Sequence, residues 1–397
     1  MYDLTSPGFF ADPSPTLTRM REEDPLHFHE PLRAWILTRY DDVFHVLRDS
    51  RFSVDRNGAI SRCPVPSVQR ELDECNSAFG EWMVFSDPPR HARLRDRVAS
   101  SFTPARVRSL EPAIRQIAHE MAVAARAKGE IDLIAELATP LPARVTAALI
   151  GITLEDVSTL SSDTDEVFAF FGAGIASAEV VTAAHASLGR MRAYFEGLLA
   201  SRRARPGADL LSWVVEAESL EPTLERDELV GLAMTLVAGA FGTTSHLIGH
   251  AVLAMVEHRE WEALVADRSL ARGVVEETLR YDGPALAVQR RAREDVELRG
   301  HVIHRGERVY CMLSAANRDP RVFECPDVFD PRRSPNKHLG LGGGTHFCLG
   351  AGLARLEASI ALEVLAEEVP ALRLAGAPRR AGNMAMRGLA SLPVATR

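Results

Sequence analysis

The residue with the clearest chemical potential in this sequence is Cys348, a cysteine at the end of a glycine-rich run. Residues 341–350 read LGGGTHFCLG, and an apolar stretch typical of a helix follows them. Glycines let the backbone approach something large and flat, and backbone amides near a helix start favour the thiolate over the thiol. A thiolate held in this way can ligate haem iron and push electron density onto the metal. For an isolated cysteine, a buried and inert structural residue is the alternative.

The spacing of this run resembles the haem-binding signature of cytochrome P450 monooxygenases, Phe-Gly-x-Gly-x-His-x-Cys-x-Gly. The resemblance implies that Cys348 is the ligand of the iron in a heme b cofactor. It also implies that four further residues of the run bind the cofactor: Gly342, Gly344, His346 and Gly350. Leu341 stands where the family usually has phenylalanine, which alters packing and hydrogen bonding near the sulfur but leaves the ligand unchanged.

A second segment with chemical potential lies inside a long stretch without charged residues, residues 229–256. Within it, residues 237–246 read VAGAFGTTSH. Glycines and hydroxyls inside a helix lower its stability, so they indicate a local bulge or a closely approaching ligand; packing by small residues is the alternative. The segment resembles the family's oxygen-activation motif, Ala/Gly-Gly-x-Asp/Glu-Thr-Thr. Aligned on the threonines, Thr243 takes the place of the oxygen-side hydroxyl and Gly242 takes the place of the acid.

Gly242 raises a question about protons, because it has no carboxyl group to relay them to the oxygen side. Three sources remain open. Ordered water held by Thr243 can carry protons, a polar group of the substrate can supply them, or His246 can stand in for the acid. His246 lies about one helical turn beyond Thr243, and a histidine side chain titrates near neutrality.

Cations are needed to hold the two propionates of a haem. His91 and Arg95 lie four residues apart, so on a helix both reach one side of a bound anion, although a solvated basic face fits the same spacing. The resemblance implies that these two residues, together with Arg290 and His346, bind the propionates.

A Glu-x-x-Arg motif lies on another predicted helix, where Glu277 and Arg280 share a face. An isolated pair of this kind is usually a solvated surface pair. The motif resembles one that is structural in the family, and the resemblance implies a lock between Glu277, Arg280 and a later arginine, here Arg333. We expect these residues to serve folding and haem retention.

The resemblance also places the walls of a substrate pocket, which are apolar and predict an apolar substrate. Ordinary core packing is the alternative for each aromatic residue. The candidate wall residues are Trp82, Met83, Val84, Phe168, Phe171, Phe241, Leu286, Ala287 and Val288.

The elements that must position these residues are mainly helices. The clearest predicted helices are residues 107–127, 229–258 and 351–368, and short strands are predicted near residues 34–38, 296–298 and 309–310. No regular strand–helix alternation is visible, so a doubly wound sheet is disfavoured. The fold class is therefore mainly α with small β-sheets. The resemblance implies the cytochrome P450 fold, with haem between two long helices, in a single domain over residues 1–397.

Charge, cysteine content and hydropathy limit the partners and the compartment that this protein can have. The net charge of −8 is spread along the chain, which argues against a nucleic-acid partner. The five cysteines show no CxxC pair or disulfide-scaffold spacing, which suits a reducing compartment. Residues 229–256 are long enough to cross a bilayer, but the polar residues 243–246 in their middle favour a buried helix. No signal peptide is visible at the N-terminus. We expect a soluble, cytoplasmic monomer without a membrane span.

The resulting hypothesis is a haem-thiolate monooxygenase that activates O2 with electrons from a separate ferredoxin and ferredoxin reductase. It would hydroxylate or epoxidise an apolar small molecule of natural-product, terpenoid or fatty-acid metabolism. Arg93 and Arg97 are then expected to serve the acidic redox partner. Because of Gly242, an atypical or peroxide-using oxidase that performs coupling or desaturation is an alternative. A haem-binding sensor or carrier without turnover is another, and Thr243 within a glycine-containing helix argues against it.

Overall fold

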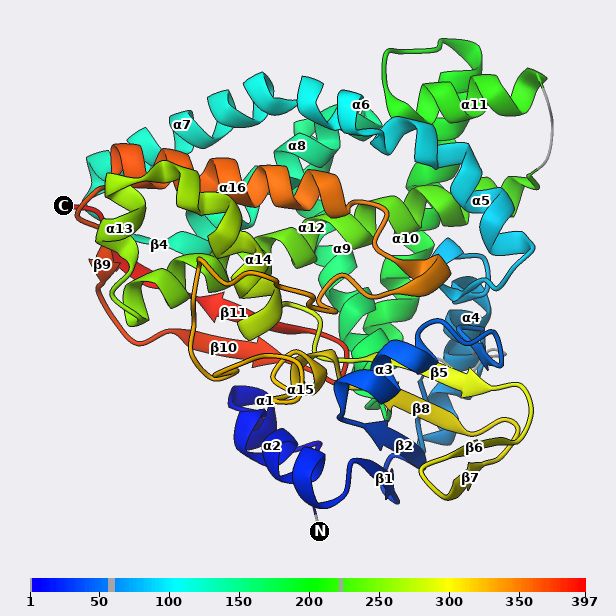
Figure 1. The fold of residues 1–397 in the computed structure, drawn as a ribbon. Helices are drawn as coiled ribbons and strands as arrows, with labels where there is room; N and C mark the ends of the chain where they lie inside the picture. Colours follow the sequence, from blue (N-terminus) through cyan, green and yellow to red (C-terminus); the bar gives the residue numbers. More distant parts are fainter. Residues whose placement is uncertain (1, 56–60, 221–223) are drawn as a thin grey trace. The chain divides into compact units, whose positions relative to one another are not determined.

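The structure is a computed structural model that describes residues 2–55, 61–220 and 224–397 (Figure 1). Helices dominate the described residues, which confirms the prediction of a mainly α fold. The α-helices are α1 (Pro7–Ala11), α2 (Ser14–Glu23), α3 (Tyr40–Val46), α4 (Gln69–Phe79), α5 (Arg90–Ala99), α6 (Pro104–Ser109), α7 (Glu111–Lys128), α8 (Pro140–Ile150), α9 (Leu154–Ala173), α10 (Ala178–Ala204), α11 (Leu210–Leu220), α12 (Arg226–Glu257), α13 (Trp261–Ala266), α14 (Ala271–Tyr281), α15 (Leu313–Ala316) and α16 (Ala351–Glu368).

The strands are short and form several small sheets. They are β1 (Leu26–His29), β2 (Ala34–Leu37), β3 (Phe52–Ser53), β4 (Glu130–Asp132), β5 (Val288–Ala292), β6 (Val296–Leu298), β7 (His301–Ile303), β8 (Arg308–Cys311), β9 (Arg373–Leu374), β10 (Arg379–Gly382), β11 (Arg387–Ser391) and β12 (Pro393–Ala395). Strands β1, β2, β8 and β5 lie side by side in that order. Strands β2 and β8 are parallel, whereas the pairs β1–β2 and β5–β8 are antiparallel. All three predicted strand positions are confirmed, in β2, β6 and β8.

Close packing divides the chain into two compact units, each assembled from segments that are distant in sequence. The first unit comprises Met1–Phe52, Pro104–Pro142 and Thr243–Arg397, and the second comprises Ser53–Thr103 and Ala143–Gly242. The first unit contains the cysteine run and the Glu-x-x-Arg motif. The second contains α5 and all four predicted aromatic wall residues. The expectation of a single domain over residues 1–397 stays a prediction.

Helix α16, which follows the cysteine run, packs along α7 and against α14 (Figure 1). One helix was predicted over residues 107–127, but the structure has two, because α6 ends at Ser109 and α7 begins at Glu111. The reason is Pro112 in the first turn of α7. Its ring has no N–H to donate to the preceding turn, so a proline is tolerated at a helix start and not in a helix interior.

Helix α12 contains the long uncharged stretch expected from the sequence, residues 229–256. By length and composition it could cross a membrane, but 67% of its most apolar window is buried inside the protein. Such burial is typical of a core helix in a folded protein. The helix runs without a break through residues 237–246, so the bulge that the glycines suggested is absent from this described segment.

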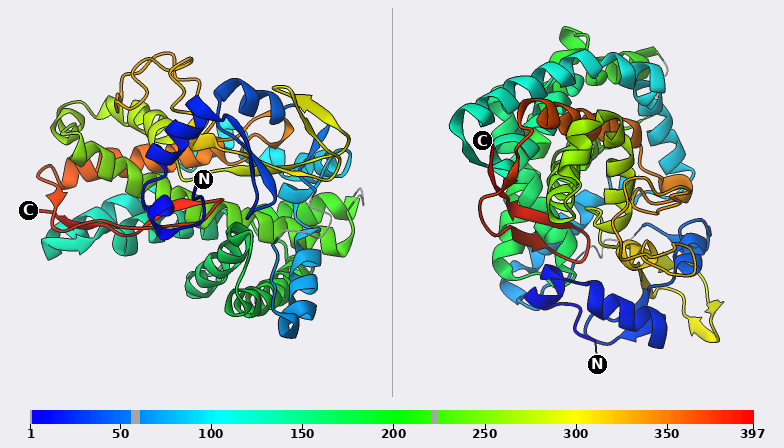
Figure 2. Two further views of the ribbon diagram at one scale, coloured as in Figure 1. Left: turned by 90° about the horizontal axis from the view of Figure 1, so that it is seen from below. Right: turned by 60° about the vertical axis from the view of Figure 1, so that its left-hand side comes forward.

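The N-terminal helices lie beside the hairpin of β10 and β11, as both views in Figure 2 show (blue and red). Phe9 of α1 and Met20 of α2 belong to the same buried apolar cluster as Leu286, Ala287 and Met384. This cluster fixes the segment before β5, which was predicted to line the substrate pocket.

Candidate active site

The cysteine run forms a tight loop that ends at helix α16. The amide of Cys348 donates to the carbonyl of Leu341 at 3.0 Å, which closes the loop on itself. Gly344 has a φ of 65°, and a side chain there would place its Cβ 2.4 Å from the Leu47 carbonyl oxygen. Only glycine fits this position without strain. The loop therefore places the cysteine directly before the N-terminus of α16, where amide groups and the helix dipole favour a thiolate.

Cys348 also differs from the other cysteines in its accessibility. It is half-buried, whereas Cys63, Cys75 and Cys311 are buried. Beyond it, Gly350 faces open space, since no other heavy atom among the described residues lies within 4 Å of the position that its Cβ would take. Burial raises the pKa of the Cys311 thiol to about 12, so that residue fits the inert alternative. Cys348 is the cysteine placed to ligate a large group.

A charged network that the sequence reasoning missed lies behind the cysteine. Arg355 of α16 donates twice to Glu276 of α14, at 2.6 and 2.9 Å, and His338 lies 3.0 Å from the same carboxylate. Burial alone would raise the pKa of Glu276, but these two partners outweigh it and lower the pKa to about 2. The pKa of Arg355 is raised, mainly by Glu276 and in smaller part by Cys348. Glu276 thus fixes and largely compensates the Arg355 guanidinium, which lies within electrostatic range of Cys348.

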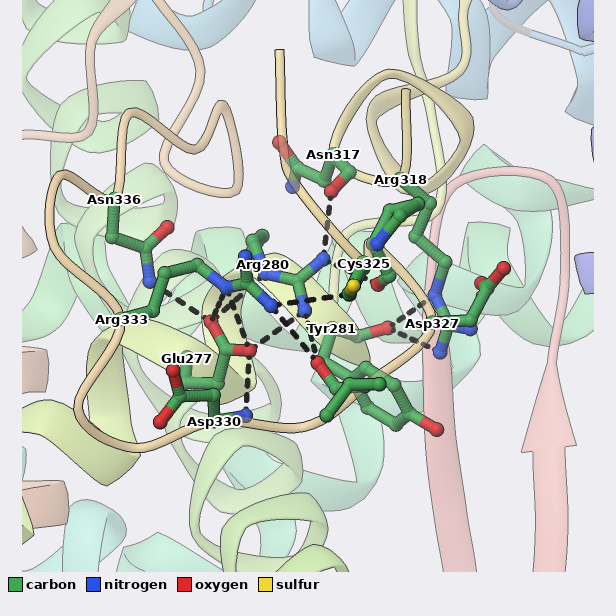
Figure 3. Close-up of polar contacts among 12 residues, drawn as sticks. Glu277, Arg280, Tyr281, Asn317, Arg318, Cys325, Asp327, Asp330, Arg333 and Asn336 are labelled. Carbon is green, nitrogen blue, oxygen red and sulfur yellow. Dashed lines mark hydrogen bonds and ion pairs between the residues drawn. The ribbon is translucent and has the colours of Figure 1, made fainter. Parts of the chain in front are cut away.

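The Glu-x-x-Arg motif forms a buried clamp (Figure 3). Arg280 donates to both carboxylate oxygens of Glu277, at 2.7 and 2.8 Å. Arg333 Nε also donates to both, at 3.1 and 3.2 Å, so the predicted contact between Arg333 and Glu277 is confirmed. Asn336 and the amide of Asp330 add two more hydrogen bonds to the same carboxylate. Glu277 and Arg280 are fully buried.

The clamp also fixes the loop that precedes the cysteine run. Arg280 donates to the backbone carbonyls of Asn317, Pro326 and Val328. Arg333 donates to the carbonyl of Glu324 at 2.7 Å. Arginine forks of this kind set geometry as well as charge, so the clamp ties α14 to the segment that leads to the cysteine.

The predicted oxygen-side residues lie in the middle of α12. Thr243 is half-buried, and Ser245 hydrogen-bonds to Thr139 at 2.9 Å. Gly239 and Gly242 face open space, because no heavy atom outside their own helix backbone lies within 4 Å of their Cβ positions among the described residues. The two glycines therefore leave room beside the helix, as a closely approaching ligand requires.

His246 is placed differently from what the sequence suggested. Its ring packs against Gly388 of β11, where any Cβ would lie 2.3 Å from the ring, and it stacks near His250 at 6.4 Å between ring centroids. Burial first, and then His250, lower the pKa of His246 to about 4. The expectation that His246 titrates near neutrality is therefore wrong, because its neighbours exclude the water that would stabilise an imidazolium.

Part of the predicted pocket wall lies in the first unit. Leu286 and Ala287 are buried, and Val288 begins β5. The amide of Leu286 donates to the carbonyl of Ala385 at 3.0 Å, and Met384 packs into the same cluster. The turn 383–386 between β10 and β11 thus packs against residues 286–287, a contact that the sequence reasoning missed because no local signal points to it.

The aromatic wall residues lie in the second unit, where most of them form one cluster. Phe171 contacts Phe168 and Phe85, and Trp82 contacts Phe79, with ring centroids 5.0–6.0 Å apart. These spacings favour offset or edge-to-face aromatic packing. Met83 and Phe241 are buried, whereas Val84 is 45% exposed and takes no part in this cluster. Phe79 and Phe85 are buried members of the same cluster.

The four predicted propionate ligands fall in both units. In the second, His91 and Arg95 lie one turn apart on the more buried face of α5, and burial followed by Arg95 lowers the pKa of His91. In the first, Arg290 is a buried cation on β5, and His346 lies in the cysteine loop. Their role toward a propionate stays a prediction.

The two arginines expected to serve a redox partner are engaged within the protein. Arg97 Nε lies 2.8 Å from Glu218 of α11, with the two side chains 18% and 8% exposed. Arg93 pairs with Glu228 of α12, as does Arg90. The expectation that Arg93 and Arg97 are left for an acidic partner is therefore wrong, because carboxylates distant in sequence fold back onto α5.

Replacing Arg97 with glutamate is expected to lower the free energy of unfolding by about 1–3 kcal/mol, because it sets two carboxylates together at a poorly exposed site. Chemical denaturation measures this. The charge-swapped double variant Arg97→Glu with Glu218→Arg should recover most of the loss. If Arg97→Glu kept full stability and was reduced more slowly by a ferredoxin, Arg97 would instead be assigned to the contact with an acidic redox partner.

Comparison with known proteins decides the family. The polyketide biosynthesis cytochrome P450 PksS of Bacillus subtilis (strain 168) is 35% identical to this chain over 399 residues, which cover 97% of this chain and 96% of that protein. The chain belongs to the cytochrome P450 family. The family described as cytochrome P450 also matches residues 262–367 of this P450, which include the Glu-x-x-Arg clamp and Cys348.

Two further comparisons bear on fold and activity. The cytochrome P450 monooxygenase PikC of Streptomyces venezuelae is 38% identical over 397 residues, covering 97% of this P450 and 91% of PikC. The structure of P450BioI in complex with acyl carrier protein ligated to hexadec-9Z-enoic acid matches at a TM-score of 0.90 and 32% identity. It covers 98% of this P450 and 100% of that chain. The predicted cytochrome P450 fold is confirmed, and this P450 is a haem-thiolate monooxygenase.

The residues present fit a haem. A half-buried cysteine at a helix N-terminus, a glycine loop with open space at Gly350, and Arg355 near the sulfur together suit a large planar group held by a thiolate. Buried Arg290, in the same unit as Cys348, supplies a cation that a propionate can neutralise.

Proposed function

We propose that this P450 binds haem through Cys348 and oxidises an apolar small molecule on the Thr243 side of α12. The observation that carries the proposal is the placement of Cys348, half-buried at the N-terminus of α16 with Arg355 nearby. Haem held by a thiolate supplies the activation of O2 that insertion of an oxygen atom into a carbon–hydrogen or carbon–carbon double bond requires.

Other residues of the chain bind the cofactor, transfer protons and position the cysteine loop. Within the first unit, Arg290 and His346 would bind a propionate and so orient the cofactor. The hydroxyl of Thr243 both donates and accepts hydrogen bonds, so it holds a water in place and passes a proton toward the reacting oxygen. The clamp around Glu277 keeps the cysteine loop in register with α14.

The substrate that we propose is an apolar molecule derived from a polyketide or a fatty acid. The aromatic cluster of the second unit offers apolar side chains, and apolar surface binds a substrate by excluding water. The names of PksS and of the P450BioI complex point to polyketide and carrier-bound acyl substrates. Spectral shifts on adding free fatty acids, polyketide lactones or carrier-linked acyl chains would rank these classes.

We also propose the redox partners, the oligomeric state and the compartment of this P450. Electrons come from a separate ferredoxin and ferredoxin reductase. In support, the alignment with this chain covers 96% of PksS and 91% of PikC, which leaves no room for a fused reductase in those two relatives. The protein acts as a monomer in the cytoplasm, where its cysteines stay reduced. Reconstitution with a surrogate ferredoxin and reductase is the corresponding assay.

Replacing Thr243 with alanine is expected to lower product formed per reduced nicotinamide consumed by about tenfold, because a positioned proton donor is lost. Nicotinamide oxidation should continue and hydrogen peroxide should accumulate. The matched control is Thr235→Ala, which removes a hydroxyl that bonds within the same helix, to Gly231, and it should leave this ratio unchanged. An unchanged ratio in Thr243→Ala would remove Thr243 from the mechanism.

A peroxide-using oxidase is the second candidate, and Gly242 in place of an acid is the observation that favours it. Such an enzyme receives its protons with the peroxide and needs no reductase. Product formed efficiently from peroxide alone, with feeble turnover through ferredoxin, would replace the first proposal with this one.

A further inference from the structure

The carboxylate of Asp165 lies beside the aromatic cluster of the second unit. Asp165 is on α9, three residues before Phe168, and residues three apart on a helix are neighbours. The ring of Phe168 meets that of Phe171 edge to face, with 6.0 Å between centroids, and Phe171 contacts Phe85 at 5.5 Å. The carboxylate is thus next to two of the aromatic residues that were predicted to line the substrate pocket.

A ligand can reach this position. Asp165 is exposed, and Phe168 and Phe171 are half-buried. The Asp165 carboxylate has no hydrogen bond or ion pair with any residue that the structure describes. Its oxygens are therefore available to a bound molecule without the loss of an existing contact.

Burial nevertheless acts on Asp165. It raises the pKa of the carboxyl group, and no charged neighbour contributes to the shift. Exposed carboxylates elsewhere in the chain, such as Glu74 and Asp295, have a pKa that hydrogen-bond partners lower. Burial also raises the pKa of Glu357 in α16, but that residue is only 2% exposed. The protein therefore surrounds Asp165 without covering it, which sets it apart from a surface carboxylate and from a core carboxyl group.

The other charged or titratable groups that face α9 are bound elsewhere or lie at its end. They are Arg190 of α10, which binds Asp163 and Glu166; Tyr194 of α10, which donates to Asp156; Glu71 and Glu74 of α4, which bind Thr182 and His185; and Arg62, whose backbone bonds to Gly174 and Ala176 beyond the helix. No cation of the described chain therefore neutralises Asp165.

An accessible carboxylate next to aromatic rings suits a cationic ligand. Aromatic faces attract ammonium groups, and rings recognise quaternary ammonium ligands in this way. An ionised group that burial desolvates is costly without a partner, so a bound cation removes a cost that the free protein carries. A carboxylate ligand would meet a like charge, and a neutral alcohol would gain a hydrogen bond but no charge pairing.

We propose that Asp165 binds a positively charged alkylamine group of the substrate, with Phe168 and Phe171 against its alkyl substituents. This inference rests on the proposed function, because it takes the aromatic cluster as part of the substrate pocket. It narrows the proposed polyketide and acyl classes to members that carry a basic nitrogen, and it disfavours a free fatty acid. The alternative is a solvated carboxylate that contacts no ligand.

Three ligands with the same chain and different head groups test the proposal. They are decyltrimethylammonium, decan-1-ol and decanoate, and the quaternary ammonium stays charged at every pH and cannot ligate iron. Isothermal titration calorimetry of the holoenzyme, at concentrations below micelle formation, gives the affinities. We expect decyltrimethylammonium to bind about tenfold more tightly than decan-1-ol, and decanoate to bind more weakly than both. Equal affinity for the ammonium and the alcohol would overturn the proposal.

Variants at Asp165 assign the preference to this side chain. Asp165→Asn keeps the shape and removes the charge, so it should lower the affinity for decyltrimethylammonium about tenfold and change that for decan-1-ol by less than about twofold. Asp165→Lys should reverse the order, so that decanoate binds more tightly than decyltrimethylammonium. The matched control is Glu166→Gln, which makes the same change in net charge one residue away, where the carboxylate accepts from Ser187. It should keep the original preference, and an equal loss there would assign the effect to the overall charge of the protein.

The pH dependence of binding identifies the titrating group. Because the ligand binds the ionised carboxylate, its affinity should fall as the pH falls through the raised pKa of Asp165. Asp165→Asn should show no such dependence. A dependence that persists in this variant would assign the binding to another acid.

Thermal stability gives a readout that needs no ligand. Ionisation of Asp165 opposes folding, because its pKa is higher in the folded chain than in the unfolded one. Asp165→Asn should therefore raise the melting temperature at neutral pH by about 1–2 °C, and acidification should narrow the difference. A lower melting temperature would show that Asp165 supports the fold instead of a ligand.

The outcomes separate this inference from the proposed function. Oxidation of decan-1-ol without any preference for the ammonium ligand would overturn the role of Asp165 and leave the monooxygenase standing. A charge preference measured by calorimetry, in a protein that lacks the thiolate-type spectrum, would support the role of Asp165 and overturn the proposed function.

Discussion

Replacing Cys348 with alanine is expected to abolish oxygenation, with a loss of at least about a thousandfold in turnover, because the electron push of an axial thiolate is removed. The loop and α16 should keep their structure, since the backbone hydrogen bond from residue 348 to Leu341 does not involve the side chain. Product formation with a surrogate ferredoxin and reductase measures the effect. Haem content of the purified protein reports whether the cofactor is still held.

Two other cysteines provide matched controls for this experiment. Cys325 is exposed and Cys311 is buried, and neither lies in a glycine loop before a helix. Cys325→Ala and Cys311→Ala should keep haem and turnover, apart from a modest loss of stability in the second. Full turnover in Cys348→Ala, or loss of haem in Cys325→Ala instead, would assign the ligand elsewhere.

The second large effect is expected at Glu277. Its carboxylate compensates two guanidinium groups, Arg280 and Arg333, at a site where Arg280 is fully buried. Glu277→Ala leaves these charges unpaired in a dry environment, which we expect to lower the free energy of unfolding by about 3–5 kcal/mol. A typical domain is stable by only about 5–15 kcal/mol. The variant should therefore be poorly soluble and should retain little haem.

The size of the effect can be graded with other variants. Arg333→Lys keeps the charge but loses the fork, so it should destabilise less than Glu277→Ala. Glu262→Ala, at an exposed position of α13, is the control and should change the unfolding free energy very little. Thermal and denaturant unfolding monitored by far-ultraviolet circular dichroism would give the order of stability. Equal stability of Glu277→Ala and Glu262→Ala would show that the clamp does not support the fold.

The residues that could be predicted from sequence share one property, which is that a short local pattern fixes them. Cys348 is marked by glycines at fixed spacing. Gly344 shows why a glycine is needed in this run, since its φ of 65° and its close approach to Leu47 tolerate no side chain. Glu277 and Arg280 are marked by helical spacing. Their partner Arg333 was found because the family resemblance supplied the distant half of the contact.

The residues that were missed depend on contacts between segments distant in sequence. Glu276, Arg355 and His338 meet only because α14 packs against α16. The pairing of Arg97 with Glu218 needs α11 to return to α5. A spacing rule describes one helix face at a time and carries no information on which other helix covers that face. Charges on α5 were therefore interpreted as free when they are paired.

The pKa of His246 likewise depends on tertiary contacts that sequence spacing does not show. The sequence places it one turn from Thr243, which is correct, but its pKa is set by burial beneath β11 and by His250. Whether a ring is exposed or covered by Gly388 is decided by tertiary packing, and the side-chain type alone predicts a titration near neutrality.

The measurement that tests the central claim most directly is the absorption spectrum of the reduced, carbon monoxide-bound protein, recorded for the unmodified chain and for Cys348→Ala. A thiolate ligand and a neutral ligand give distinct Soret bands. We predict the thiolate-type band in the unmodified protein and its disappearance in Cys348→Ala. Two results would contradict the assignment of Cys348 as the ligand. One is a thiolate-type band in Cys348→Ala, and the other is the lack of such a band in the unmodified protein.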